Sequence, residues 1–199
     1  ACIHRVKMDL FNKYGLIAAA GDRHLAEFMP GDLYLKDPET VKSWGFGLTS
    51  VAWRKDDLNK RLERSHRLVS GEEKLELKET GEEGILLIKA LCGLIRLESN
   101  VNIPNTGKQI TNLPADAVVE TNAIFERDAI RPVLAGALPE NVKELIMPHV
   151  ENHERALKAA MTKDKALLTE AFLNDPLVKG RASKEDVKKL VEDMMAATL

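Results

Sequence analysis

Apolar residues at helical spacing dominate the N-terminal third of the chain. Val6, Leu10 and Phe11 repeat on one helical face. Residues 54–69 place leucines among many charged residues, which is typical of a helix with one face in water. Residues 1–70 are therefore predicted to be mostly helical.

A second helical region begins at Pro139, a residue that suits the first turn of a helix. An apolar stripe continues through Met161, although Pro148 should kink this helix or begin a new one. A further helix is predicted over residues 165–173. The capping-box pattern that begins at Ser183 starts a last helix, whose apolar positions are Val187, Leu190, Val191 and Met194.

The middle of the chain has a different periodicity. Residues 74–78 alternate as a short strand would, and residues 82–94 read as a helix. Three strands are then predicted at residues 97–103, 108–113 and 117–125, separated by turns rich in proline, asparagine and glycine. The chain is thus expected to be an α+β protein, helix-rich with a small antiparallel sheet.

Composition and charge exclude some partners. Hydrophobic residues make up 44% of the 199 residues, which is enough for a core, and the 29 basic and 31 acidic residues nearly cancel. The sequence has no dense block of Lys and Arg residues of the kind that indicates a nucleic-acid partner. The most apolar stretch, residues 84–95, includes Lys89 and is shorter than the roughly 20 residues of a membrane span, so it is predicted to be a buried helix.

The cysteines and histidines give weak signals for chemistry. Cys2 and Cys92 form no CxxC pair, and this favours a reducing compartment, which we take to be the cytoplasm. Residues 1–7 have neither the apolar core nor the cleavage site by which a secretory signal is predicted. His149 and His153 lie four residues apart on a predicted helix, but no HExxH motif accompanies them. Polar helix positions explain this pair better than a metal site, and no metal ligand is assigned.

One short cluster, residues 21–28, has the composition of an active site. Asp22 can move a proton or hold hydroxyl groups, Arg23 can grip an anion with its planar fork, and His24 titrates near neutrality. The alternative is a charged helix start, in which Asp22 caps the first turn and Arg23 is solvated. Taken by itself, the local pattern favours the cap.

Amide side chains form the second candidate. Asn100 and Asn102 lie two residues apart on a predicted strand, and Asn105 follows in a turn. Amides at this period point to one side of a sheet and can bind a polyhydroxylated ligand without adding charge. Turn chemistry is the alternative, and the local pattern favours it.

Several segments, taken together in their order along the chain, resemble a known family more specifically than any single motif does. They are residues 6–11, 19–28, 46–49, 100–105, 112–114, 117–122, 134–139 and 175–178. Together they resemble the C-terminal half of family 4 glycoside hydrolases, in the branch of α-galacturonidases, α-glucosidases and α-galactosidases. The resemblance implies a fold similar to the C-terminal domain of lactate dehydrogenase-like enzymes.

The resemblance also implies a reaction, one that differs from the usual two-carboxylate hydrolysis. In this family NAD oxidises the sugar at C3, a divalent metal, usually manganese, stabilises the enediolate, and a base removes the C2 proton. Elimination, addition of water and return of the hydride complete the cycle. By position, Asp22 would be the catalytic carboxylate, and Arg23, His24, Asn102 and Asn105 would bind the substrate, an α-glycoside.

The chain also departs from the family pattern. No GxGxxG segment is present, so the NAD-binding Rossmann domain of the family is expected to be missing from this sequence. The family's metal-binding Cys and His belong to upstream segments and are not transferred to Cys2 or His4. The turn at residues 105–110 has one extra residue before Gln109.

Two hypotheses follow. The chain is either the substrate-facing portion of a family 4 glycosidase, inactive alone, or a non-catalytic domain for binding or oligomerisation. An apolar face left bare by the missing domain predicts a homo-oligomer.

Overall fold

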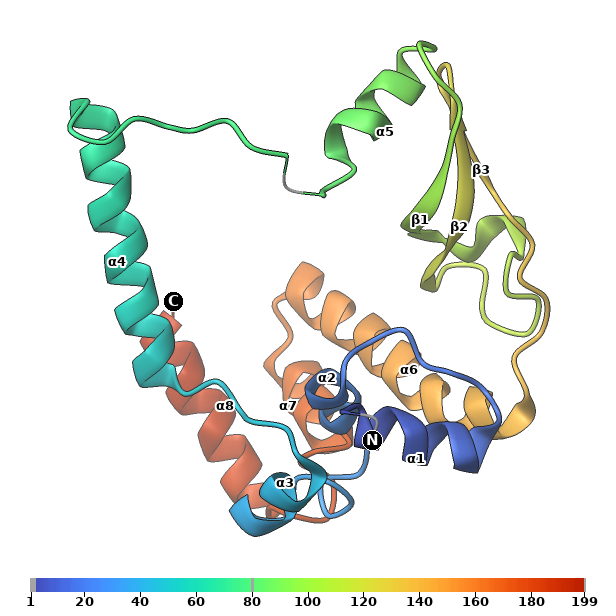
Figure 1. Cartoon of the computed structure of the whole chain (residues 1–199). Coiled ribbons are helices and arrows are strands. Elements are labelled where there is room, and N and C mark those ends of the chain that lie inside the picture. The colour runs from blue at the N-terminus through green and yellow to red at the C-terminus, as the bar shows by residue number, and fades with distance from the viewer. Residues whose placement is uncertain (1–2, 80, 199) are drawn as a thin grey trace. The chain divides into compact units, whose positions relative to one another are not determined.

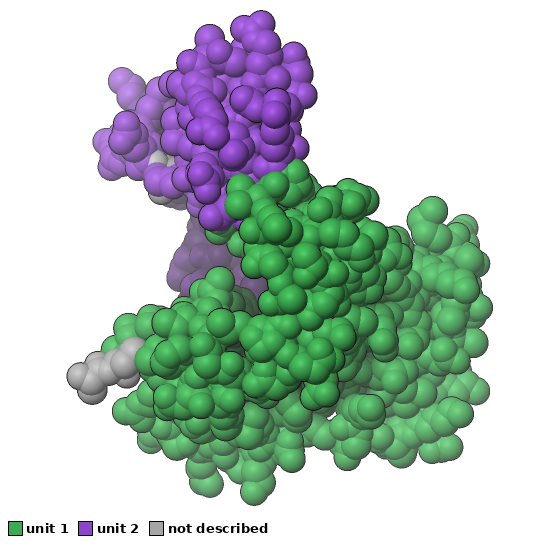
Figure 2. Space-filling model, turned by 90° about the vertical axis from the view of Figure 1, so that its right-hand side faces the viewer, with its two compact units in different colours: residues 1–46, 100–121, 132–199 green, residues 47–99, 122–131 purple. Residues whose placement is uncertain are grey.

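The computed structural model describes residues 3–79 and 81–198, which form two compact units (Figure 2). Unit 1 comprises residues 1–46, 100–121 and 132–199, and unit 2 comprises residues 47–99 and 122–131. Cys2 lies outside the described residues. Every predicted site residue belongs to unit 1.

Most of the helices, which are labelled in Figure 1, belong to unit 1. They are α1 (Arg5–Tyr14), α2 (Asp22–Glu27), α3 (Pro38–Trp44), α6 (Glu140–Thr162), α7 (Lys165–Asn174) and α8 (Lys184–Thr198). Unit 2 contains α4 (Val51–Ser70) and α5 (Gly84–Leu91). The predicted helical ends of the chain are thereby confirmed.

Local chemistry explains where several helices begin and end. The side chain of Ser50 accepts a hydrogen bond from the Trp53 amide and caps α4, while Asp164 caps α7 in the same way. α1 ends at Gly15, whose φ of 75° is the left-handed conformation that glycine adopts without strain. Pro148 lies inside α6, so of the two expected outcomes it does not begin a new segment, and the kink stays a prediction.

The three strands form one antiparallel sheet. They are β1 (Leu97–Pro104), β2 (Val118–Glu126) and β3 (Ala129–Pro132), in the order β1-β2-β3. Asp128, with φ of 54°, supplies the tight turn between β2 and β3. This small sheet in a helix-rich chain confirms the α+β class.

Two of the predicted strands are absent from the described structure. Residues 108–113 follow the 3-10 turn η1 (Asn105–Gly107) and form only an isolated bridge, from Ile110 to Gly136, because side-chain hydrogen bonds bend this loop. Residues 74–78 have the alternation of a strand but are in no sheet. A strand needs a neighbour, and local alternation does not supply one.

Two clusters of buried apolar side chains lie among the described residues of unit 1. The first includes Val6, Leu10 and Tyr34, joined by residues of α2. The second includes Leu113 and Val119. The first cluster packs α1 against α2 and therefore positions the candidate acid at the start of α2.

The prediction of a buried helix at residues 84–95 was half right. α5 forms there, but Ile85, Ile88 and Leu94 are exposed, and Ala90 is the buried residue of this helix. The apolar sequence thus predicted the helix correctly, but it did not predict that large apolar side chains of this region are exposed.

Candidate active site

Asp22 lies at the first position of α2, and its carboxylate faces the start of α1. Oδ2 accepts a hydrogen bond from the Val6 amide and Oδ1 one from the Lys7 amide, both at 3.0 Å. The residue is 7% exposed. Asp22 therefore caps a neighbouring helix, whereas its own helix begins at Gly21 without a side-chain cap.

The electrostatics of this contact are favourable. The first amides of α1 have no partner within the helix and carry its positive end, so a carboxylate is stabilised there. His4 Nδ1 lies 3.9 Å from Asp22 Oδ1 and adds a positive charge when it is protonated. Each carboxylate oxygen accepts one of these amides and keeps a second lone pair for another donor.

Arg23 and His24 follow on α2. Arg23 is half-buried, and the His24 side chain is largely exposed. Nδ1 of His24 lies 3.2 Å from Glu27 Oε2, one helical turn further on. Asp22, Arg23 and His24 thus differ in burial, and Asp22 is the most buried of the three.

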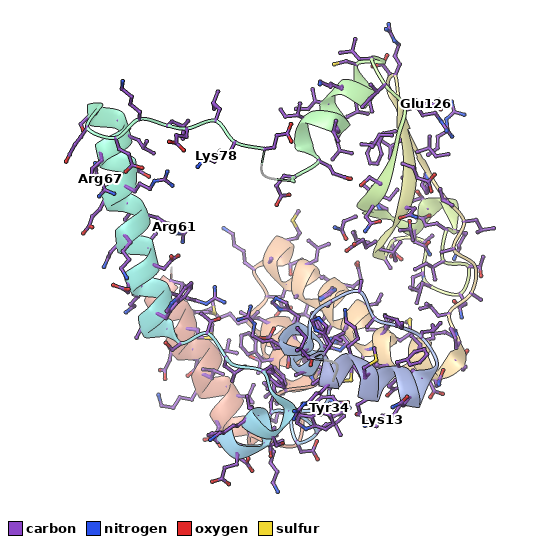
Figure 3. The ribbon with its side chains drawn as sticks, in the orientation of Figure 1. Lys13, Tyr34, Arg61, Arg67, Lys78 and Glu126 are labelled. Atoms are coloured by element: carbon purple, nitrogen blue, oxygen red, sulfur yellow. The ribbon has the colours of Figure 1, made fainter. Side chains whose placement is uncertain are left out.

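A polar contact beside this cluster was missed from the sequence. Tyr34 is fully buried and its hydroxyl donates to Asp9 Oδ2, which also accepts from Lys13 at 2.7 Å. Tyr34 and Lys13 are labelled in Figure 3. The Lys13 ammonium also lies 5.5 Å from the centre of the Tyr34 ring. The sequence did offer one signal, since Asp9 is an acidic residue beside the apolar Leu10. Its partner Tyr34, however, is 25 residues further along the chain.

This contact shifts both pKa values. Burial, and then the hydrogen bond to Asp9, raise the pKa of Tyr34 well above its usual range. Burial alone would raise the pKa of Asp9, but the hydrogen bonds from Lys13 and Tyr34 outweigh it and lower this pKa. At neutral pH the pair is therefore a neutral phenol that donates to a carboxylate.

The predicted amide face of the sheet is present. Burial alternates along β1, and Asn100 and Asn102 lie on its exposed side. On β2, Val118, Glu120 and Asn122 occupy the exposed positions, and Asn100 Nδ2 lies 3.4 Å from Glu120 Oε1. These strands place polar side chains on one face, as the spacing predicted.

Asn105 has a different environment, because it is completely buried. Its amide nitrogen donates to the carbonyls of Ile110, Leu113 and Pro114, and its oxygen accepts from the Ile110 amide. These contacts hold the loop after β1 together. Asn105 therefore shapes this loop, and its direct contact with a substrate stays a prediction.

The extra residue of this turn also has a clear position. Lys108 adopts a left-handed conformation, with φ of 51°, and its ammonium donates to the Leu113 carbonyl. Asn112 exchanges two hydrogen bonds with the backbone of Leu138, each of 2.9 Å. The loop thus accommodates the insertion. Asp22 and Asn105 form hydrogen bonds with different segments of the chain.

The described residues do not form a complete metal site. Residues 3–79 and 81–198 contain no group of three or more His, Cys, Asp or Glu side chains that could hold a metal ion. His149, half of the histidine pair, lies 3.0 Å from the Phe28 carbonyl through Nε2. None of the described helices is long and apolar enough to cross a membrane.

Comparison with known proteins defines the class. The model of the family 4 glycosyl hydrolase C-terminal domain matches residues 2–178. The chain therefore belongs to the family 4 glycosyl hydrolases.

Its relatives define the branch. The chain is 68% identical over 198 residues to an alpha-galacturonidase of Lachnoclostridium phytofermentans, covering 100% of this chain and 42% of that protein. It is 60% identical to an alpha-galacturonidase of Thermoanaerobacterium saccharolyticum, covering 98% of this chain and 41% of that protein. The chain thus spans less than half the length of these relatives.

Solved structures agree with the fold. A Bacillus subtilis protein, lplD, superimposes with a TM-score of 0.86 at 48% identity, over 96% of this chain and 42% of that one. The 6-phospho-beta glucosidase of Thermotoga maritima, solved with manganese, NAD+ and glucose-6-phosphate, gives a TM-score of 0.70 at 21% identity, over 95% of this chain and 43% of that one. The second likeness shows the fold alone.

Proposed function

We propose that this chain is the substrate-facing C-terminal portion of an NAD- and manganese-dependent glycosidase that hydrolyses α-galacturonides. The observation that carries the proposal is the 68% identity to an alpha-galacturonidase, which extends over the whole chain. The isolated thiols Cys2 and Cys92 support a cytoplasmic enzyme.

Arg23 is the residue that we assign to the uronate. A galacturonide differs from a galactoside by a carboxylate, and the guanidinium fork of Arg binds a carboxylate through two parallel hydrogen bonds. Arg23 is half-buried directly after Asp22, on a helix whose buried residues anchor it in the core. His24, which is more exposed, is assigned to sugar hydroxyls.

Asp22 is the proposed catalytic carboxylate. Its two backbone hydrogen bonds fix the carboxylate, and the remaining lone pairs can accept a proton or a sugar hydroxyl. Asp22 thus has two roles in this proposal, one in capping α1 and one in the reaction. Asn102, exposed on β1, is assigned to further hydroxyls of the substrate.

The residues of this chain do not fit a complete NAD or manganese site. The sequence has no glycine-rich dinucleotide motif, and the described side chains include no metal-ligand cluster. We assign both groups to the part of the relatives that this chain does not cover. Bound there, NAD would supply oxidising power at the sugar, and the metal would stabilise a developing oxyanion.

The test is an assay of the chain joined to, or mixed with, the NAD-binding half of the Lachnoclostridium phytofermentans relative. Nitrophenyl α-galacturonide and nitrophenyl α-galactoside are compared in the presence of NAD+ and Mn²⁺. Release of nitrophenol from the galacturonide, only when both halves are present, is expected. No turnover of either substrate by folded material would favour a non-catalytic domain.

A substitution sharpens the assignment of the uronate. Arg23→Lys keeps the charge but loses the planar fork, so turnover of the galacturonide should fall about tenfold or more while that of any galactoside changes little. An equal loss on both substrates would remove Arg23 from carboxylate recognition.

A further inference from the structure

The short helix α2 is held at both of its ends. At its start, the Asp22 carboxylate accepts hydrogen bonds from the Val6 and Lys7 amides, both at 3.0 Å. At its end, the Phe28 carbonyl lies 3.0 Å from His149 Nε2, and the two rings meet edge to face with 5.2 Å between their centres. A helix of six residues is not stable alone. These contacts with α1 and α6 therefore fix where α2 lies and how it is turned.

The two faces of α2 differ in burial. The buried residues of the helix are Asp22, Leu25 and Ala26. Arg23 is half-buried, and the side chains of His24 and Glu27 are 57% and 42% exposed. At about 100° per residue, Glu27 lies between Arg23 and His24 around the helix axis, roughly 40° from the first and 60° from the second. These three side chains form one polar face, on the side of α2 opposite its buried residues.

Glu27 is in direct contact with the imidazole of His24. Its Oε2 lies 3.2 Å from His24 Nδ1. An ionised carboxylate can only accept hydrogen bonds, so the proton in this contact belongs to Nδ1. A neutral imidazole carries a single ring proton, and Nε2 then keeps its lone pair. The contact thus makes Nε2 of neutral His24 a hydrogen-bond acceptor.

The anchoring of α2 matters for the strength of this contact. An exposed pair of charged or polar side chains is usually weak, because ordering the two side chains costs entropy. Here the backbone of both residues is already fixed by the buried face and by the two ends of the helix. A carboxylate that accepts a hydrogen bond from one ring nitrogen is a general means of fixing the tautomer and orientation of a histidine.

We propose that Glu27 is a positioning residue, which keeps the proton of His24 on Nδ1 and so lets Nε2 accept a hydrogen bond from a sugar hydroxyl. The inference rests on the proposed function, in which His24 binds hydroxyl groups of the substrate. It also gives two neighbouring side chains different ligands. An acceptor nitrogen binds a hydroxyl but not a carboxylate, whereas the guanidinium group of Arg23 binds the carboxylate.

NMR of the chain labelled with nitrogen-15 tests the tautomer without any turnover. At about pH 8.5, where free imidazole is neutral, a long-range proton–nitrogen correlation spectrum shows which ring nitrogen of each histidine carries the proton. We expect Nδ1 for His24. In the same spectrum we expect Nε2 for His149, because its partner, the Phe28 carbonyl, can only accept. His24→Gln identifies the His24 signals.

Two substitutions separate the carboxylate from the rest of the helix. Glu27→Ala should lower the ratio of the Nδ1-protonated to the Nε2-protonated form of His24 at least threefold, while Glu27→Gln should keep it, since the amide oxygen still accepts. The matched control is Glu151→Ala, which removes an exposed glutamate of α6 two residues from both His149 and His153. Helical side chains at that spacing do not face each other, so the tautomers should not change.

Kinetics test the link to the substrate. The chain is joined to the NAD-binding half proposed for the Lachnoclostridium phytofermentans relative, and nitrophenyl α-galacturonide is the substrate. Glu27→Ala should raise KM about threefold with little change in kcat, because a contact made in the bound substrate is weakened. Glu27→Gln should restore KM to near the parent value, and Glu151→Ala should leave it unchanged.

Three results would overturn the proposal. They are a parent chain in which Nε2 of His24 carries the proton, a Glu27→Ala chain that keeps the Nδ1 form, and a changed tautomer with an unchanged KM. Absence of turnover in the joined parent would instead contradict the proposed function. The spectrum of Glu27→Ala would then still decide whether Glu27 positions His24.

Discussion

The two compact units of this chain differ in where their apolar side chains lie. Unit 1 buries Val6, Leu10 and Tyr34 in a cluster that joins three segments, and the candidate site is built on that cluster. In unit 2 the buried apolar residues are Ala90, Ala123 and Phe125, while α4 and α5 expose large ones. The difference indicates that unit 1 stabilises itself, whereas unit 2 depends on contacts outside it.

The largest effect is expected for Leu10→Ala. Leu10 is 4% exposed in the cluster that packs α1 against α2, so removing most of its side chain leaves a cavity and should lower the free energy of unfolding by about 3 kcal/mol. Urea denaturation followed by circular dichroism measures this change. A loss below about 1 kcal/mol would mean that unit 1 lacks a close-packed core.

Asn105→Ala should cause the next largest loss in the free energy of unfolding. The substitution removes the acceptor of the Ile110 amide and the donor to the Pro114 carbonyl, whereas the Ile110 and Leu113 carbonyls keep the Leu113 amide and the Lys108 ammonium as donors, and we expect a cost of about 2 kcal/mol in the free energy of unfolding. Asn102→Ala is the control, because Asn102 is exposed on the preceding strand and should cost less than about 0.5 kcal/mol. Equal effects of the two variants would contradict the loop-shaping role of Asn105.

Tyr34→Phe should cost about 1 kcal/mol at neutral pH, since it removes the hydrogen bond to Asp9. Because the pKa of Tyr34 is raised in the folded chain, the stabilisation that its hydroxyl contributes depends on pH. Its stabilising contribution is complete below pH 10, where the phenol is neutral in both states, and it declines as pH rises above that value. The parent should therefore lose more stability than Tyr34→Phe between pH 8 and pH 11.

Absorbance isolates that ionisation. The chain has two tyrosines, so in Tyr14→Phe the phenolate signal near 295 nm comes from Tyr34 alone. Ionisation at the usual tyrosine pH in the folded chain would contradict the buried contact with Asp9.

The smallest effect is expected for Leu62→Ala. Leu62 is 50% exposed on α4, so the substitution should change the free energy of unfolding of the monomeric chain by less than about 0.5 kcal/mol. The contrast with Leu10→Ala is the sharpest one between the units. A loss of 2 kcal/mol or more in dilute monomer would show that α4 is covered within its own chain.

Periodicity predicted the fold well where it reports on local structure. The helices near Val6 and beyond Pro139 were found from their apolar stripes, and β1 and β2 were predicted as strands bounded by turn residues. Residues 74–78 and 108–113 were wrongly assigned to strands, because pairing depends on neighbours that a local pattern does not specify. The exposure of α5 was missed for the same reason.

The candidate site shows a similar limit. The sequence identified Asp22 as either a helix cap or a catalytic acid, and the structure places it as a cap, though of α1 rather than of its own helix. Only the fold brings residue 22 to residues 6 and 7. Asn105 was predicted to bind substrate, with turn chemistry as the alternative that the local pattern favoured, and its hydrogen bonds to Ile110 and Leu113 agree with that alternative.

The most direct test of the proposed catalytic role is turnover by Asp22→Asn in the chain joined to the NAD-binding half proposed for the Lachnoclostridium phytofermentans relative. Asparagine keeps an oxygen for one α1 amide but cannot act as a base, so folding should survive while hydrolysis of nitrophenyl α-galacturonide falls by about 100-fold or more. The folded fraction is measured in the same sample by circular dichroism. Turnover within a few-fold of the parent would contradict the catalytic role and leave Asp22 as a helix cap.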